Sequence, residues 1–362
     1  MTRRVFLALA MVLSLSVVVA PRAATRGVDV PARLTDAQFW QTIEDFSEPG
    51  GSFRSDNLLS NEIWFQYIIP DLKAYLKPGG VYLGVGPEQN FTYIAALQPK
   101  MVIIFDIRRG NLHTHLMYKA IFEMAADRSD FVSLLFSRKK PQGLGPKSTV
   151  QELFAGISAV PPDEDLYQAN YKRLTDHLTR ARKLPLPQDD LDGIEYVYRN
   201  FQRFGSAITY NSSTGGGGGR NAATYATLMT ADDGRGEARS FLATEALFGV
   251  LKDLHTRNLV IPVVGDFAGP KAIRAVGRYL KAQGATVTAF YLSNVEQYLT
   301  QNGVWQAFCQ NFATLPLTEE STFIFSQGGG GGRGGGRGGG LDSYYRRMLQ
   351  DVKTNGCAGG RP

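Results

Sequence analysis

Short apolar runs alternate with helix-length amphipathic segments along most of this chain. In residues 81–106, an apolar run, a Gly-x-Gly turn, an amphipathic segment and a second apolar run follow one another. A second unit of this kind covers residues 259–292, with its turn at 265–270 and its helix-length segment at 271–283. Strands that alternate with helices predict an α/β fold with a largely parallel, doubly wound sheet.

The same reading predicts further elements on either side of these units. Residues 34–46 have the apolar spacing of a helix, with Thr35 or Asp36 as its N-cap, and residues 111–126 are predicted to form another helix. Three more short apolar runs are predicted strands: Phe131–Phe136, Ser206–Tyr210 and Ser321–Ser326.

The distribution of these elements indicates one domain. We expect a single Rossmann-like α/β domain over residues 34–326, with residues 138–200 as a helical insertion, because that stretch holds prolines, charges and helix-like pieces. Residues 327–340 are a Gly/Arg low-complexity loop. Residues 341–362 are expected to form a C-terminal helix and tail.

The N-terminus has the features of an export signal, which we assign to residues 1–24. Residues 2–7 match the twin-arginine pattern Ser/Thr-Arg-Arg-x-Phe-Leu, and the apolar run 5–20 is too short for a membrane span. Pro21 opposes cleavage after Ala20, so later cleavage and an uncleaved membrane tether both stay open. An ordinary secretory signal also stays open. In each case the domain is expected outside the cytoplasm.

The charge of the chain gives no sign of a nucleic-acid partner. The 39 Lys and Arg residues exceed the 33 Asp and Glu residues by 6, but they are spread along the chain rather than gathered in one stripe. The expected partner is a small-molecule ligand, and contact with a membrane is expected only through an uncleaved signal.

The positions of the cysteines and histidines bear on disulfide bonds and on metal binding. Cys309 and Cys357 can pair in an oxidising compartment, but Cys357 lies in a Gly-rich tail, so we expect two unpaired thiols. His113 and His115 are two positions apart and therefore lie on different faces of a helix. No metal site is expected.

The first Gly-x-Gly turn is the strongest chemical signal. Gly84 and Gly86 would let a ligand approach the main chain, and Asp106, 20 residues past Gly86, could accept two ribose hydroxyls in parallel. The dinucleotide fingerprint would need Gly or Ala at Gln89, so NAD is disfavoured. The methyl-donor pattern would need Gly at Glu88. The alternative is that the glycines only allow close helix–strand packing.

Polar residues follow several predicted strand ends, which meet at one edge of a parallel sheet. The candidate adenosine-binding residues are Gly84, Gly86, Glu88, Asn90, Asp106, Ile107 and Arg108. The candidate substrate or crevice residues are Tyr210, Asn211, Asp266, Phe267 and Asn294. In the alternative interpretation, Asp266 and Asn294 only cap helices.

Four segments resemble those of a bacterial family of unassigned function, which is itself similar in fold to class I methyltransferases. They are residues 52–58, 84–93, 106–112 and 291–298, and the resemblance extends from about residue 34 to 326. It implies a Rossmann-type domain and no substrate. Residues 81–106 as a whole resemble the S-adenosylmethionine-binding edge of a class I methyltransferase, so S-adenosylmethionine is the expected cofactor.

Two functions follow as hypotheses. The first is an exported methyltransferase-like protein that binds S-adenosylmethionine or S-adenosylhomocysteine. The second is a non-catalytic binding protein of the cell envelope that keeps the fold. Asn211 lacks the two following prolines typical of amine methylation, and no Ser/His/Asp or Cys/His arrangement suggests a hydrolase. The orientation of Glu88 discriminates between these two hypotheses, because a carboxylate facing the ligand would repel the carboxylate of the methyl donor.

Overall fold

The computed structural model describes residues 29–214, 223–328 and 341–357. The expected export signal, and residues 329–340 of the expected Gly/Arg loop, lie outside these residues. Within the described ranges, no helix is both long and apolar enough to cross a membrane.

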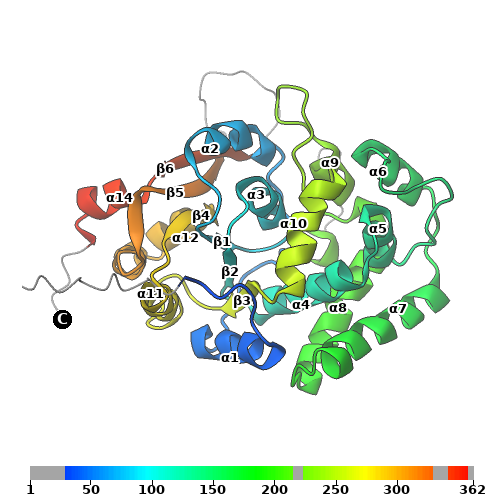
Figure 1. Cartoon of the computed structure of the whole chain (residues 1–362), viewed down its shortest axis with the longest axis horizontal. Helices are drawn as coiled ribbons and strands as arrows, with labels where there is room; N and C mark the ends of the chain where they lie inside the picture. Colours follow the sequence, from blue (N-terminus) through cyan, green and yellow to red (C-terminus); the bar gives the residue numbers. More distant parts are fainter. Residues whose placement is uncertain (1–28, 215–222, 329–340, 358–362) are drawn as a thin grey trace, which may run out of the picture.

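Six strands form one sheet in the order β3-β2-β1-β4-β5-β6 (Figure 1). Their bounds are β1 (Val81–Val85), β2 (Met101–Asp106), β3 (Val260–Val264), β4 (Val287–Ser293), β5 (Leu317–Gly328) and β6 (Leu341–Arg347). β1 to β5 are parallel, and β6 pairs antiparallel with β5. The predicted α/β fold with a largely parallel sheet is confirmed. The strand order reverses between β1 and β4, which is where such sheets bind ligands.

Helices cover both faces of the sheet (Figure 1). One layer holds α1 (Asp36–Phe46), α11 (Ala272–Ala282) and α13 (Trp305–Phe312). The other holds α2 (Ile69–Tyr75), α3 (Gln89–Leu97), α4 (Arg109–Met124) and α10 (Glu245–Thr256). Two short helices, α12 (Val295–Gln301) and α14 (Met348–Thr354), follow β4 and β6.

A group of helices extends beyond the second layer, on the right of Figure 1. It consists of α5 (Arg128–Phe136), α6 (Val150–Ser158), α7 (Glu164–Asp176), α8 (Gln188–Phe204) and α9 (Tyr225–Thr230). Residues 138–200, the expected helical insertion, contain α6, α7 and most of α8. These helices separate β2 from β3 in the sequence.

Local signals explain several elements directly. Thr35 caps α1 by accepting the N–H of Gln38, whose side chain binds the N–H of Thr35 in return. Pro262 stands inside β3 because β3 is an edge strand, where a missing N–H costs no ladder bond on the open side.

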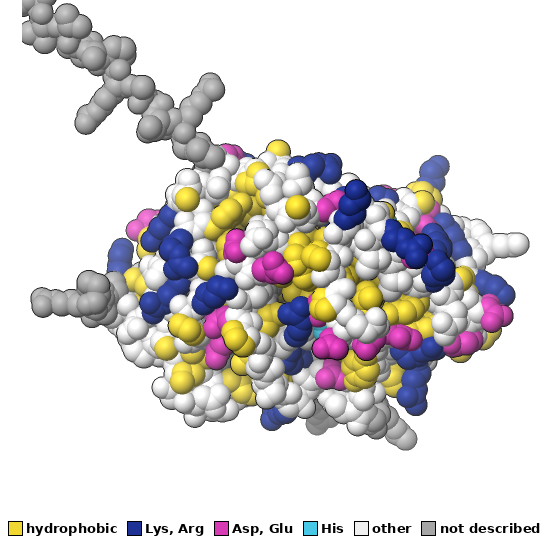
Figure 2. Space-filling view, turned by 90° about the horizontal axis from the view of Figure 1, so that it is seen from below, with side chains coloured by type: hydrophobic (Ala, Val, Ile, Leu, Met, Phe, Trp, Pro, Cys, Tyr) yellow, Lys and Arg dark blue, Asp and Glu magenta, His cyan; other side chains and the backbone are white. Residues whose placement is uncertain are grey.

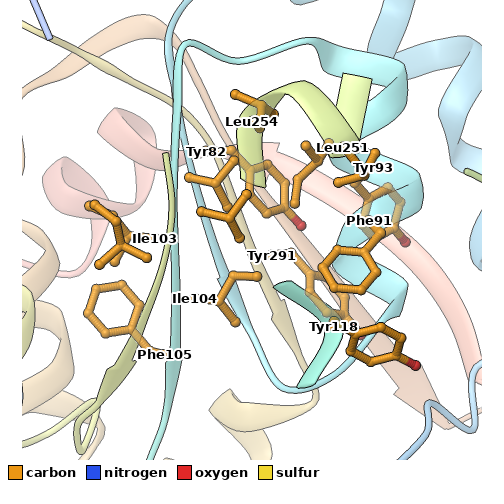
Figure 3. Close-up of a cluster of buried hydrophobic side chains, with 14 of the residues drawn as sticks. Tyr82, Phe91, Tyr93, Ile103, Ile104, Phe105, Tyr118, Leu251, Leu254 and Tyr291 are labelled. Atoms are coloured by element: carbon orange, nitrogen blue, oxygen red, sulfur yellow. The ribbon is translucent and has the colours of Figure 1, made fainter. Parts of the chain in front are cut away.

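The core is built on alternating positions of the central strands. Ile103 and Phe105 point to one side of β2 and Ile104 to the other (Figure 3). Phe105 meets the rings of Phe267 and Phe290, with ring centroids 6.0 Å apart in both pairs. Both sides of β2 are buried, as expected of a strand covered by two helical layers.

Three predicted elements differ from the structure. Residues 131–136 lie in helix α5, because Asp127 caps its first turn by accepting the N–H of Asp130 and helices surround the apolar run. Residues 206–210 hold a 3₁₀ turn and one isolated bridge at Thr209 rather than a strand of the sheet. The segment from residue 341 forms strand β6 before helix α14 begins, so its first part is not helical.

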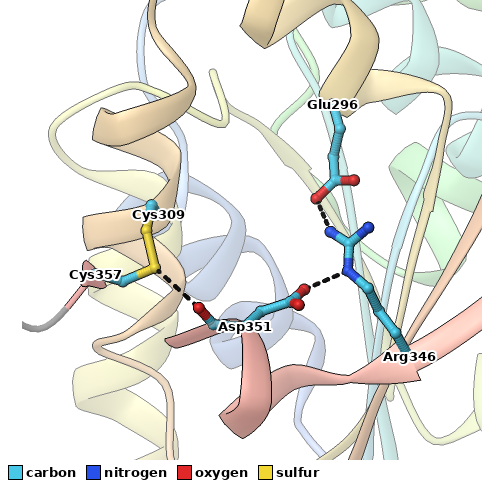
Figure 4. The surroundings of a disulfide bond; sticks show 5 residues. All are labelled: Glu296, Cys309, Arg346, Asp351 and Cys357. Atoms are coloured by element: carbon cyan, nitrogen blue, oxygen red, sulfur yellow. Dashed lines mark hydrogen bonds and ion pairs between the residues drawn. A yellow bond between two sulfur atoms is a disulfide. The ribbon is translucent and has the colours of Figure 1, made fainter. Parts of the chain in front are cut away.

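Cys309 and Cys357 form a disulfide, with their Cα atoms 5.0 Å apart, so the expectation of two unpaired thiols was wrong. The chain returns to α13 because β6 pairs with β5 and α14 packs against β5. Arg346 holds this arrangement by binding both Glu296 and Asp351 (Figure 4).

Candidate functional site

A cleft of about 700 Å³ opens at the carboxyl ends of β1, β2, β3 and β4. The structure brings together most of the candidate residues in its walls: Gly86, Asp106, Ile107, Arg108, Tyr210, Asn211, Asp266, Phe267 and Asn294. These residues come from segments far apart in the sequence, and the strand ends bring them to one edge.

Gly84 and Asn90 support the Gly-x-Gly turn from behind and do not line the cleft. A Cβ on Gly84 would lie 1.9 Å from Oδ1 of Asn90. The Asn90 amide donates to the carbonyls of Val85 (2.9 Å) and Pro87 (2.8 Å). Gly86 has a φ of +75°, and the space where its Cβ would stand is empty. Of the two glycines, Gly86 is therefore the one that can offer its backbone to a ligand.

Glu88 faces the protein interior and does not line the cleft. Its Oε1 accepts the N–H of Ser60 at 3.2 Å, and its Oε2 has no hydrogen-bond partner in the described chain. Burial raises the pKa of Glu88 to about 8. Glu88, predicted as a ligand-binding residue, therefore does not line the cleft, and its side chain is turned away from the space where its charge would repel a bound carboxylate.

The two histidines of α4 face different neighbours, as their spacing predicts. Nε2 of His115 lies 2.9 Å from the carbonyl oxygen of Gly86, and burial lowers the pKa of His115 to about 4. The neutral ring donates to Gly86 and holds the turn. His113 binds Asp190, which also takes two hydrogen bonds from Arg109. Burial opposes ionisation of Asp190, but these bonds lower its pKa to about 2.

Asp106 reaches the cleft with most of its acceptor capacity occupied. Its Oδ1 accepts the backbone N–H and Nε of Arg108, each at 2.9 Å, and its Oδ2 accepts Nη2 of Arg108 at 2.6 Å. A carboxylate oxygen has about two lone-pair sites. Oδ2 can therefore accept one further hydroxyl, rather than the carboxylate accepting two in parallel.

The loop of residues 52–62 forms a wall of the cleft that the sequence analysis did not assign to the site. Arg108 donates to the carbonyl of Ser55 at 2.8 Å and thereby ties this loop to the end of β2. Arg54 donates to the hydroxyl of Tyr298 at 2.8 Å across the mouth of the cleft. The polar composition of the loop was visible in the sequence, but its position above the sheet was not.

Asp266 and Asn294 line the cleft in different local settings. The Asp266 carboxylate accepts the N–H of Ala268 at 2.9 Å within its own turn. Asn294 makes no side-chain cap at the start of α12. Ser293, at the end of β4, has a φ of +51°, a left-handed conformation that is costly for a residue with a side chain.

One known protein family matches most of this chain. A domain of unknown function (DUF7790) matches residues 57–330. The chain belongs to this family. No curated protein matches it.

The DUF7790 segment contains β1 to β5 and the cleft residues that follow them. Phe53 and Arg54, which also line the cleft, precede it, and β6 follows it. In the described part of this family member, no group of three or more His, Cys, Asp or Glu side chains could hold a metal ion. On the face seen in Figure 2, acidic side chains lie among the basic ones.

Proposed function

We propose that this protein is methyltransferase-like and binds an adenosine-type ligand, S-adenosylmethionine or S-adenosylhomocysteine, in the cleft. One observation carries the proposal: the open turn at Gly86 and the carboxylate of Asp106 line the same cleft at the point where the strand order reverses. Ligands of this class need backbone access for one end and a carboxylate for the ribose.

The remaining contacts support this assignment. Asp106 has one acceptor site left for a ribose hydroxyl, and Ile107 and Phe267 add apolar surface to the cleft. The strand order is that of dinucleotide-binding sheets, with the difference that β6 is antiparallel. Glu88 is turned away, so the cleft wall near Gly86 does not carry its charge.

Methyl transfer needs the sulfonium and the acceptor atom held in line, so positioning supplies much of the rate. Tyr210, Asn211 and Asn294 are the residues of the cleft that we assign to the acceptor side. No catalytic base is required by this proposal.

Calorimetry with S-adenosylmethionine and S-adenosylhomocysteine tests the adenosine site. Asp106→Asn removes the charge and should weaken binding by about 1.5–3 kcal/mol, the range for a hydrogen bond to a charged group. Asp45→Asn, on an exposed position of α1, is the control and should bind like the parent. If the parent binds neither compound, the proposed function fails; if Asp106→Asn binds like the parent, the role of Asp106 fails.

The disulfide favours a second candidate function, a non-catalytic binding protein of the cell envelope. Cys309 and Cys357 are paired, and such bonds persist in oxidising compartments, where S-adenosylmethionine is not expected. Mass spectrometry of ligand released from protein purified natively from the envelope separates the two. Recovery of an adenosine compound supports the first function, and recovery of another small molecule supports the second.

A further inference from the structure

Glu62 is a buried carboxylate at the floor of the cleft, with 1% of its surface exposed. Its Oε1 accepts the hydroxyls of Tyr291 (2.7 Å) and Ser293 (2.6 Å). Its Oε2 accepts the amide of Gln89 (2.7 Å) and the hydroxyl of Ser326. Four donors thus converge on one side chain at the ends of β4 and β5.

All four donors are uncharged groups, so hydrogen bonds rather than an ion pair hold the carboxylate in the described chain. A buried carboxylate without a cation is electrostatically complementary to a cation that enters the adjoining space.

The carboxylate also sets the direction of the neighbouring hydroxyls. Each of these O–H groups donates its only hydrogen to Glu62, because an ionised carboxylate accepts and does not donate. The oxygens of Tyr291 and Ser293, which both line the cleft, are left with lone pairs and no hydrogen to offer. These two hydroxyls therefore present only acceptors to the cleft.

We propose that the floor formed by Glu62, Tyr291 and Ser293 binds a positively charged group of the ligand, a protonated amine or a sulfonium. The inference rests on the cleft of the proposed function but not on the adenosine ligand. It extends the site to a residue of the 52–62 loop and names the charge of the ligand.

Saturation-transfer NMR with simple probes tests the floor independently of adenosine. Tetramethylammonium should bind the parent at millimolar concentrations, and uncharged tert-butanol, of similar size, should not. Glu62→Gln keeps the shape and removes the charge, and it should weaken tetramethylammonium binding about ten- to hundredfold. Asp45→Asn, on an exposed position of α1, is the control and should bind tetramethylammonium like the parent.

Calorimetry with three adenosine compounds then identifies the source of the charge. If Glu62→Gln weakens the binding of S-adenosylmethionine alone, the floor binds the sulfonium. If Glu62→Gln weakens the binding of S-adenosylmethionine and S-adenosylhomocysteine equally but leaves adenosine binding unchanged, the floor binds the ammonium group.

The outcomes separate the two proposals. If the parent binds tetramethylammonium but binds none of the adenosine compounds, the cation site is upheld and the proposed function is overturned. Equal binding of tetramethylammonium and tert-butanol by the parent overturns the cation site, whether or not Glu62→Gln folds.

Discussion

Replacing Glu88 by Gln should change how the stability of this protein depends on pH. Glu88 is fully buried, and among the described residues only its Oε1 has a hydrogen-bond partner. The buried hydroxyls of Tyr118 and Tyr225 couple electrostatically to it. Gln has nearly the same shape, carries no charge, and offers an amide donor in place of the protonated carboxyl.

The magnitude follows from the raised pKa. Burial, with a smaller contribution from the charge of Glu62, raises the pKa of Glu88 from its ordinary 4.5 to about 8. At about 1.4 kcal/mol per pKa unit, ionised Glu88 costs the folded state about 5 kcal/mol relative to the protonated form. The stability due to the protonated group is fully present below pH 4.5 and is lost as the pH rises through about 8.

Urea unfolding of the disulfide-intact protein at pH 5, 6, 7 and 8 measures this loss. Other titrating groups are common to the parent and Glu88→Gln, so the difference between their unfolding free energies isolates Glu88. That difference should grow by about 3–4 kcal/mol in favour of Glu88→Gln between pH 5 and pH 8. The m-values should match, because the surface exposed on unfolding is unchanged.

Glu319→Gln is the control, because the side chain of Glu319 is 82% exposed. Its stability should follow that of the parent at each pH. Parallel curves for the parent and Glu88→Gln would refute the reasoning, since they would mean that Glu88 titrates alike in the folded and unfolded protein.

Three further predictions concern the turn, the C-terminal tail and the support of the cleft. Gly84→Ala should destabilise the protein by about 1–3 kcal/mol in urea unfolding, because the new methyl group would overlap Asn90; unchanged stability would contradict the close packing. Cys309→Ser with Cys357→Ser should cost about 4 kcal/mol, the chain-entropy value for 48 residues; a melting temperature equal to that of the parent would rule this out. His115→Phe should loosen the turn and weaken ligand binding by about 0.5–1.5 kcal/mol in calorimetry. The difference in binding free energy between the parent and His115→Phe should be the same at every pH between 6 and 8, because His115 is neutral there. A change in that difference near pH 6.5 would contradict the burial of His115.

Sequence patterns predicted the elements that local interactions determine. The cap at Thr35, the helix from residue 271 and the strand from residue 259 carry their signals within a few neighbouring residues. Because parallel strands place their carboxyl ends at one edge, the gathering of Asp106 and Asp266 in one cleft also followed from the order of elements.

Where the local signal was ambiguous, the surroundings decided. A six-residue apolar run such as 131–136 fits a buried strand or a buried helix equally well, and its helical neighbours made it part of α5. The direction of Glu88 was likewise open, because residues at a turn can point either way, and only its contact with Ser60 assigns it to the interior.

The sequence by itself determined the α/β alternation and the strand ends that line the cleft, because spacing and capping act over a few residues. Tertiary structure alone decided the pairing of Cys309 with Cys357 and the placement of the 52–62 loop with Glu62 above β4. Both depend on contacts between segments far apart in the chain, and no local pattern records which distant backbone a loop or tail will meet.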